Sequence, residues 1–137
     1  MSAEQHKAVF TRVIEEGFNK GNFAAWDDCF PPTIIEHQYG MPDTLEGFKK
    51  AIAGLRAAMG DFHLTIEDMV VDGDKLWVRM TGRGVHRAPF AGVPPTNKKF
   101  EITVFDVCRF EDGKIVEHWG VPDRFALLHQ LGALGPR

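Results

Sequence analysis

Apolar residues recur at helical spacing through the first part of the chain. Between about Ala3 and Asn19 they fall three or four positions apart, which predicts an amphipathic helix that ends before Gly21. A second helix is expected after Asn22 and should end at Pro31-Pro32. Asp43 and Glu46 have the spacing of a capping box and should open a third helix. Its buried side would carry Phe48, Ile52, Leu55 and Met59.

From Phe62 onward the apolar period changes from helical spacing to strict alternation. Residues 63–71 and 75–85 are predicted to form a hairpin around Asp72-Gly73-Asp74. A Gly- and Pro-rich connection, residues 86–99, leads to a second hairpin over residues 100–123. A short helix from Phe125 to Leu131, closed by Gly132, should follow.

Helices first and long antiparallel strands afterwards indicate an α+β fold. We expect one domain over residues 1–137, in which three N-terminal helices and a short C-terminal helix wrap a curved antiparallel or mixed sheet. Such a sheet would form a cone with one open end. The helices must bury their apolar sides against one sheet face, which leaves a mostly apolar pocket between the layers.

The second hairpin carries ionisable residues through an apolar pattern. If Asp112-Gly113 is a two-residue loop, Glu111 pairs with Lys114, and Asp106 then lies opposite Trp119. In the same register Ile102 lies opposite Asp123. Because side chains alternate along strands, both aspartates would share one largely apolar face. Buried carboxylates there must be paired, hydrogen-bonded or used in chemistry.

Composition and charge narrow the possible functions. The chain has 137 residues, is 44% hydrophobic and 26% charged, and has a net charge of −3, which argues against a nucleic-acid-binding surface. Its two cysteines, Cys29 and Cys108, are expected to be buried thiols rather than a disulfide. There is no apolar run resembling a signal peptide or a membrane span, so we expect a soluble, cytoplasmic protein.

Several kinds of catalytic site lack their usual motifs. The sequence has no HExxH, no HxH and no paired cysteines, so no metal site is expected. No glycine-rich phosphate loop follows a strand, and Ser2 is the only serine. We therefore expect no metal site, no phosphate-binding loop and no Ser-His-Asp catalysis.

Three segments carry a resemblance to a known family: Gly21 to His37, Leu45 to Asp123, and the tail LLHQLG. Together they resemble SnoaL-like polyketide cyclases, a branch of the nuclear-transport-factor-2-like α+β cone superfamily. The resemblance implies ring closure by intramolecular aldol condensation, without a metal or Schiff base, with an aspartate as general acid/base. It places that aspartate at Asp123 in HWGVPD. Asp123 could equally stabilise the first turn of the last helix.

Three histidines are further candidates, each with an alternative role. The resemblance suggests that His37 polarises a substrate carbonyl and that His86 lies near the cavity mouth. His37 could instead cap a strand end through backbone hydrogen bonds. In the register above, His118 falls on the face opposite Asp106, so it would pack under the helices or at a subunit interface. A β-bulge would bring it into the pocket.

The remaining candidates would bind substrate or support the pocket. Asp106 needs a partner, and Arg79 on the neighbouring strand is the expected one. Arg79, with His37 and His118, could also stabilise an enolate. Four aromatic residues are candidates for the pocket wall, and core packing is the alternative for each: Trp26, Trp77, Trp119 and Phe105.

The leading hypothesis is a cyclase or isomerase that acts on a small hydrophobic, carbonyl-bearing molecule, with Asp123 as the proton shuttle. A non-catalytic ligand-binding or dimeric interaction module is the alternative. An enzyme like limonene-type epoxide hydrolases is a second alternative, although Thr81 stands where their Arg-x-Asp pattern would need an aspartate after Arg79. We expect a homodimer or higher homo-oligomer, since outward-facing Phe105, Val107 and Val116 would otherwise be an exposed apolar patch.

Overall fold

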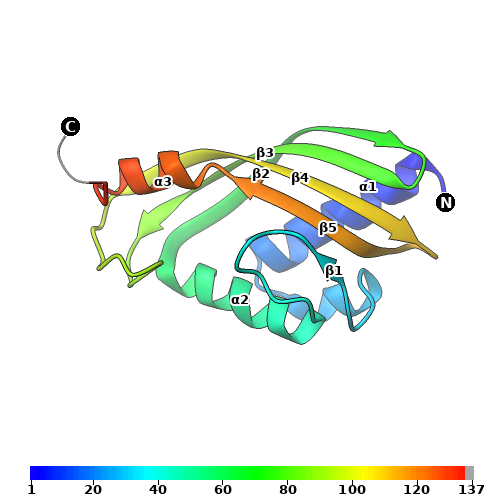
Figure 1. Cartoon of the computed structure of the whole chain (residues 1–137), viewed down its shortest axis with the longest axis horizontal. Helices are drawn as coiled ribbons and strands as arrows, with labels where there is room; N and C mark the ends of the chain where they lie inside the picture. The colour runs from blue at the N-terminus through cyan, green and yellow to red at the C-terminus, as the bar shows by residue number, and fades with distance from the viewer. Residues whose placement is uncertain (135–137) are drawn as a thin grey trace.

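The structure is a computed structural model that describes residues 1–134 (Figure 1). The helical elements precede the main strands, as the apolar spacing predicts. The first helix begins as an α-helix and continues as a π-helix, and the second is a 3₁₀-helix. The helical elements are α1 (Ala3–Arg12), η1 (Val13–Asn19), η2 (Phe23–Asp28), α2 (Leu45–Ala58) and α3 (Arg124–Gln130).

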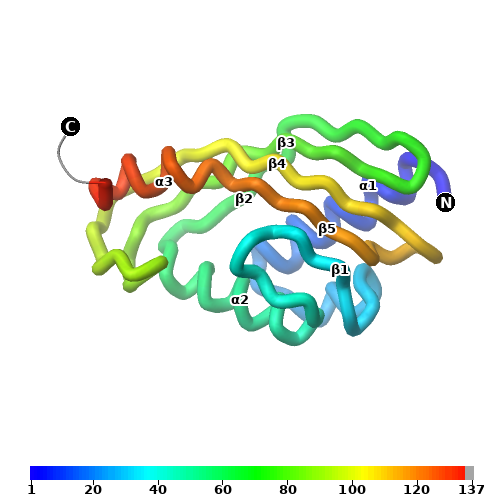
Figure 2. Tube along the Cα trace, in the orientation of Figure 1, coloured from blue at the N-terminus to red at the C-terminus, as the bar shows by residue number. Residues whose placement is uncertain are grey.

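One five-stranded sheet has the order β1-β5-β4-β3-β2. The short β1 pairs in parallel with β5, and every other pair is antiparallel. Figures 1 and 2 show the N-terminal helices and α2 on one side of the curved sheet, with α3 beyond the end of β5. The predicted α+β fold is therefore confirmed. The strands are β1 (Ile35–Glu36), β2 (Met59–Asp72), β3 (Lys75–His86), β4 (Lys99–Glu111) and β5 (Lys114–Pro122).

The core lies between the helices and the inner face of this sheet. On β3, Leu76, Val78 and Met80 are buried, whereas Trp77 between them is 56% exposed. Trp26 of η2 is fully buried and stacks on Phe48 of α2, with 4.6 Å between ring centroids. Each such apolar side chain contributes roughly 1.5–3 kcal/mol when it leaves water.

The beginning of α2 differs from the predicted capping box. Thr44, not Asp43, is the N-cap, and its Oγ1 accepts a hydrogen bond from Gly47 N at 3.1 Å. The backbone carbonyl of Asp43 accepts a hydrogen bond from Ile34 N at 2.8 Å. The chain before α2 is thus tied to the segment that leads into β1, which shifts the cap by one residue.

The connection between β3 and β4 lies at the end of α2 and below α3 in Figure 1. Its start is fixed to α2, because Arg87 N and Ala88 N both donate to Ala58 O, at 2.8 and 3.1 Å. No helix within residues 1–134 is both long enough and apolar enough to cross a membrane.

Candidate active site

A chamber of about 180 Å³ lies between α2 and the inner face of the sheet. Its walls are mainly phenylalanine, methionine and aliphatic side chains from the helices and from strands β2, β3 and β4. Among residues 1–134, three ionisable side chains line it: Asp106, His118 and Arg124. The apolar lining includes Phe18, Phe48, Ile52, Leu55, Phe62, Met80, Phe90, Phe100, Ile102 and Val104.

A β-bulge brings His118 into this chamber. The Asp112-Gly113 turn forms as predicted, with φ of 49° and 81°, and Glu111 pairs with Lys114. After Phe110 pairs with Ile115, however, Arg109 pairs with Glu117, so one residue of β5 is skipped. The predicted register is therefore wrong beyond the bulge. One extra residue reverses which face each later side chain of β5 occupies.

The shifted register brings Asp106 and His118 to the floor of the chamber, and Glu36 pairs with His118 from outside the lining. Cys108 now lies opposite His118 and Asp106 opposite Gly120, so Asp106 and His118 share the inner face. Glu36 of β1 reaches the same point, because β1 runs parallel to β5 and places Glu36 beside His118. We call Glu36, His118 and Asp106 the charged triad.

The triad has both imidazole nitrogens of His118 facing carboxylates. Nδ1 lies 2.7 Å from Oε1 and 3.0 Å from Oε2 of Glu36. Nε2 lies 3.1 Å from Oδ2 of Asp106. The side chains are nearly enclosed, with exposures of 3% for Glu36 and 11% for both Asp106 and His118. Two acceptors on opposite sides of one ring match an imidazolium with two N–H donors.

The electrostatics of the triad favour the charged form of His118. Burial by itself would lower the pKa of His118, but Asp106 and then Glu36 outweigh it and raise that pKa to about 10. The triad therefore places two of its charged side chains, Asp106 and His118, at the floor of an otherwise apolar chamber.

Gly120 leaves room for a neutral polar group beside the triad. A Cβ atom at this position would collide with Gln38 Oε1 and would lie 2.9 Å from His118 Cε1 and 3.0 Å from Asp106 Oδ1. Gln38, which lines the chamber, therefore fits into space that a side chain at position 120 would fill. Its amide and the free carboxylate oxygen of Asp106 border the same gap.

Asp123 does not lie where its predicted register placed it. The bulge removes its pairing with Ile102, and Asp123 N donates instead to Thr103 O at 2.9 Å. The residue is exposed and is the N-cap of α3, where its Oδ1 accepts from Ala126 N at 3.0 Å. The carboxylate that lines the chamber is that of Asp106.

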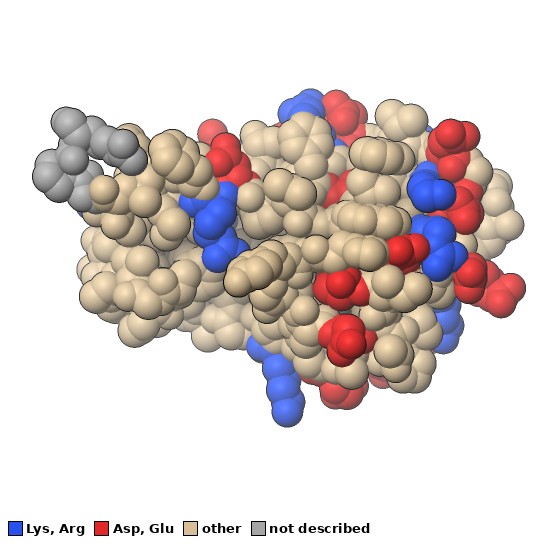
Figure 3. Space-filling view, in the orientation of Figure 1, with Lys and Arg blue, Asp and Glu red and all other residues tan. Residues whose placement is uncertain are grey.

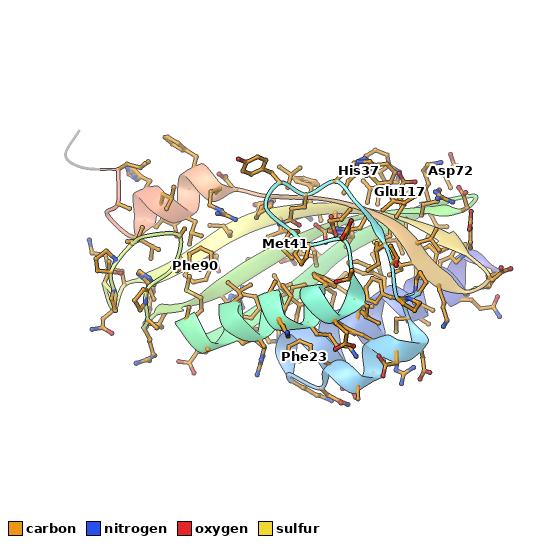
Figure 4. The ribbon with its side chains drawn as sticks, turned by 60° about the horizontal axis from the view of Figure 1, so that its bottom comes forward. Phe23, His37, Met41, Asp72, Phe90 and Glu117 are labelled. Atoms are coloured by element: carbon orange, nitrogen blue, oxygen red, sulfur yellow. The ribbon has the colours of Figure 1, made fainter. Side chains whose placement is uncertain are left out.

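His37 lies outside the chamber walls. Its ring stacks on Trp119 with 4.6 Å between centroids, and its Nε2 lies 2.7 Å from Glu117 Oε2. Figure 4 shows His37 and Glu117 close together, away from Met41 on the chamber side. Glu117 also accepts from Arg109 Nε at 2.7 Å, and these two hydrogen bonds lower the pKa of Glu117.

His86 is fully buried at the end of β3 rather than at the cavity mouth. Its Nδ1 lies 3.1 Å from Thr96 Oγ1 across the connection to β4. His86 does not line the chamber. Its backbone pairs with this same connection, through His86 N to Lys98 O at 3.0 Å and Asn97 N to His86 O at 2.8 Å, so the residue anchors the loop.

The expected partnership of Asp106 with Arg79 is wrong. Arg79 lies on the outer face of β3 and pairs there with Asp68 at 2.9 Å, because alternation along the strand directs it away from the helices. Trp77 and Phe105 are also exposed on that outer face. Trp119 lies against His37 and Trp26 lies in the core, so phenylalanines and methionines wall the chamber instead.

Three polar residues of the site were missed by sequence reasoning: Glu36, Gln38 and Arg124. Alternation around Ile35 and His37 offered a signal for Glu36, but its partner comes from a parallel pairing between segments about 80 residues apart. Gln38 and Arg124 follow β1 and β5 in irregular or helical segments, where periodicity does not show which way a side chain points. No group of three His, Cys, Asp or Glu residues within residues 1–134 has an arrangement suited to a metal ion.

Comparisons with known proteins give the family of the chain. A nogalonic acid methyl ester cyclase of Streptomyces nogalater is 28% identical over 107 residues, covering 77% of this chain and 78% of that protein. The aklanonic acid methyl ester cyclase DauD of Streptomyces sp. (strain C5) is 28% identical over 91% of this chain and 81% of its own length.

Solved structures with similar sequences share the fold of this chain. TsrD from Streptomyces laurentii superposes with a TM-score of 0.90 at 28% identity, covering 97% of this chain and 98% of TsrD. IdmH from Streptomyces antibioticus superposes with a TM-score of 0.83 at 32% identity, covering 93% and 99% of the two chains. The family model for SnoaL-like polyketide cyclase matches residues 8–131. The chain therefore belongs to the SnoaL-like polyketide cyclase family.

Proposed function

We propose that this protein is a cofactor-independent cyclase in which Asp106 is the general acid/base. The observation that carries the proposal is a carboxylate, held by a buried imidazolium, that opens into an apolar chamber. The substrate would be a small hydrophobic molecule with at least two carbonyl groups. The names of the cyclase relatives support ring closure as the reaction class.

The reaction would begin with removal of a proton from the carbon next to a carbonyl. Asp106 takes the proton, and the electrons of the C–H bond form an enolate. The enolate carbon then attacks a second carbonyl of the same molecule and forms the ring C–C bond. The resulting alkoxide takes a proton back from Asp106, so the carboxylate is restored and no other reactant is needed.

The surroundings of Asp106 suit this role. His118 fixes Oδ2 at 3.1 Å, which leaves Oδ1 directed toward the gap at Gly120. Gln38 presents its Oε1 at that gap, where it can accept a hydrogen bond from an enol or hydroxyl group of the substrate. The apolar walls exclude water, which strengthens both interactions. Glu36 holds the other side of the imidazolium and keeps its ring oriented.

The two candidate carboxylates can be separated by a matched pair of variants. In Asp106→Asn, the rate of α-proton exchange with deuterated solvent should fall by about 10²–10⁴-fold, the usual contribution of a general base. NMR can measure this exchange with 2-tetralone as a probe ketone. Asp123→Asn is the control, because asparagine also caps helices well and the site is exposed.

Asp123→Asn should leave exchange within about threefold of wild type, far below the usual contribution of a general base. If Asp123→Asn abolished exchange and Asp106→Asn did not, the base would be misassigned. If neither variant changed a measurable exchange rate, the charged triad would be a structural ion cluster. That outcome would favour the ligand-binding module, which uses the same chamber without chemistry.

The pairing of Arg79 with Asp68 on the exposed face offers no support for epoxide-hydrolase chemistry in the chamber.

We also propose that the protein forms a homodimer through the outer face of the sheet. Phe105 on β4 and Val121 on β5 are paired neighbours and are 53% and 67% exposed. Trp77 on β3 adds a third large apolar side chain, 56% exposed, to the same face. A soluble monomer seldom exposes such a continuous apolar patch.

A further inference from the structure

The size of the chamber limits the ligand that it can enclose. An apolar protein cavity of about 150 Å³ is known to hold benzene. At about 180 Å³, this chamber holds a body of about one ring. A larger substrate would have to extend through the mouth.

Charge differs between the two ends of the chamber. The floor carries Asp106, whose carboxylate lies 3.1 Å from His118, whereas Arg124 supplies the third ionisable side chain of the lining. Arg124 is exposed, so it lies where the chamber meets solvent. Figure 3 shows basic side chains where α3 begins, with acidic side chains next to them.

The guanidinium of Arg124 is held against an aromatic ring and has no carboxylate partner among residues 1–134. It lies over the ring of Phe90, 5.6 Å from the centroid, and Phe90 also lines the chamber. Within residues 1–134 it forms no ion pair, since no carboxylate oxygen lies within 4.0 Å of its nitrogens. The neighbouring Asp123 uses its carboxylate to cap α3.

Phe90 is held in place by a tight turn. Phe90 N donates to Val93 O at 3.0 Å, and Val93 N donates to Phe90 O at 2.8 Å. Ala91 and Gly92 between them have φ of 50° and 77°, as a two-residue turn of type I′ requires. Figure 4 shows Phe90 on this loop, below α3. The cation–π contact therefore fixes the guanidinium at the rim.

We propose that the substrate is a carbonyl compound with a free carboxylate, which Arg124 binds at the mouth of the chamber. This inference rests on the proposed function in one respect, because the carbonyl group of the substrate is taken from the proposed reaction. The anion site at Arg124 does not depend on that reaction. The guanidinium at the rim can donate two parallel hydrogen bonds to the carboxylate, whereas the carboxyl group of Asp106 at the floor is a poor neighbour for a second anion. The opposed charges thus fix which end of the substrate enters first and bring its carbonyl end to Asp106.

A binding experiment with a matched acid and ester tests the anion site. Calorimetry would give the affinities of 3-phenylpropanoate and of its methyl ester, which share a one-ring body and differ in charge. Wild type should prefer the acid by about fivefold, since an ion pair at a partly exposed rim contributes modestly. Arg124→Gln should remove the preference, and Arg124→Lys should retain part of it.

Arg83→Gln is the charge-matched control, because Arg83 lies on β3 outside the chamber and pairs with Glu101 at 3.2 Å. It should keep the preference for the acid. Equal affinity of wild type for acid and ester, no binding of either probe, or a preference that survives Arg124→Gln would overturn the proposal.

Asp106→Asn separates this inference from the proposed function. The variant should lose α-proton exchange yet keep or increase the preference for the acid, because it removes a negative charge from the floor. Exchange that persists in Asp106→Asn would refute the general base alone. Loss of the acid preference in Arg124→Gln would still establish the anion site in that case.

Discussion

Asp106→Asn should lower the pKa of His118, because it removes one of the two carboxylates that stabilise the imidazolium. In wild type, burial lowers the pKa of His118, while Asp106 and Glu36 raise it to a net value of about 10. An opposite charge at this distance typically shifts a pKa by about 1–3 units. The variant keeps Glu36 and loses only the Asp106 charge, so the pKa of His118 should fall by about that amount.

The same change should alter stability in a pH-dependent way. Because folding raises the pKa of His118, its contribution is fully present below the unfolded value of about 6.5 and is lost as pH rises toward about 10. At about 1.4 kcal/mol for each pKa unit, Asp106→Asn should cost on the order of 1–4 kcal/mol near pH 6. The difference in unfolding free energy between wild type and variant should narrow as the pH approaches 10.

NMR titration of the histidine ring nitrogens would measure the pKa, and urea unfolding at several pH values would measure the stability. Asp123→Asn is again the control, because it makes the same chemical change at an exposed helix cap. It should leave the titration of His118 unchanged. The reasoning would be refuted if His118 of wild type titrated near its ordinary pKa of about 6.5.

Three further predictions concern packing and assembly. Gly17→Ala should destabilise the fold by about 1–3 kcal/mol in thermal unfolding, because its Cβ would collide with the fully buried ring of Trp26; unchanged stability would contradict that packing. Gly120→Ala should displace Gln38 and lower probe-ketone exchange while the protein stays folded, as circular dichroism can check. Phe105→Asp should shift the protein from dimer to monomer in light scattering, whereas a wild-type monomer at micromolar concentration would exclude the proposed interface.

The sequence determined the elements because their signals are local. Alternation placed Leu76, Val78 and Met80 on one face and Trp77 on the other, and the positive φ values at Asp112-Gly113 match the turn that this dipeptide favours. The resemblance over residues 21–37 and 45–123 identified the family, which the match over residues 8–131 confirms.

The composition of the site was decided by tertiary structure. A single skipped residue in β5 moved His118 to the inner face, while Asp123 lies at an exposed helix cap, and no periodic pattern marks such a bulge. The partner of His118 likewise came from β1, through a parallel pairing that spans most of the chain. Local patterns fix which residues form strands, but long-range pairing fixes which carboxylates meet in the chamber, because register depends on the packing of the whole sheet.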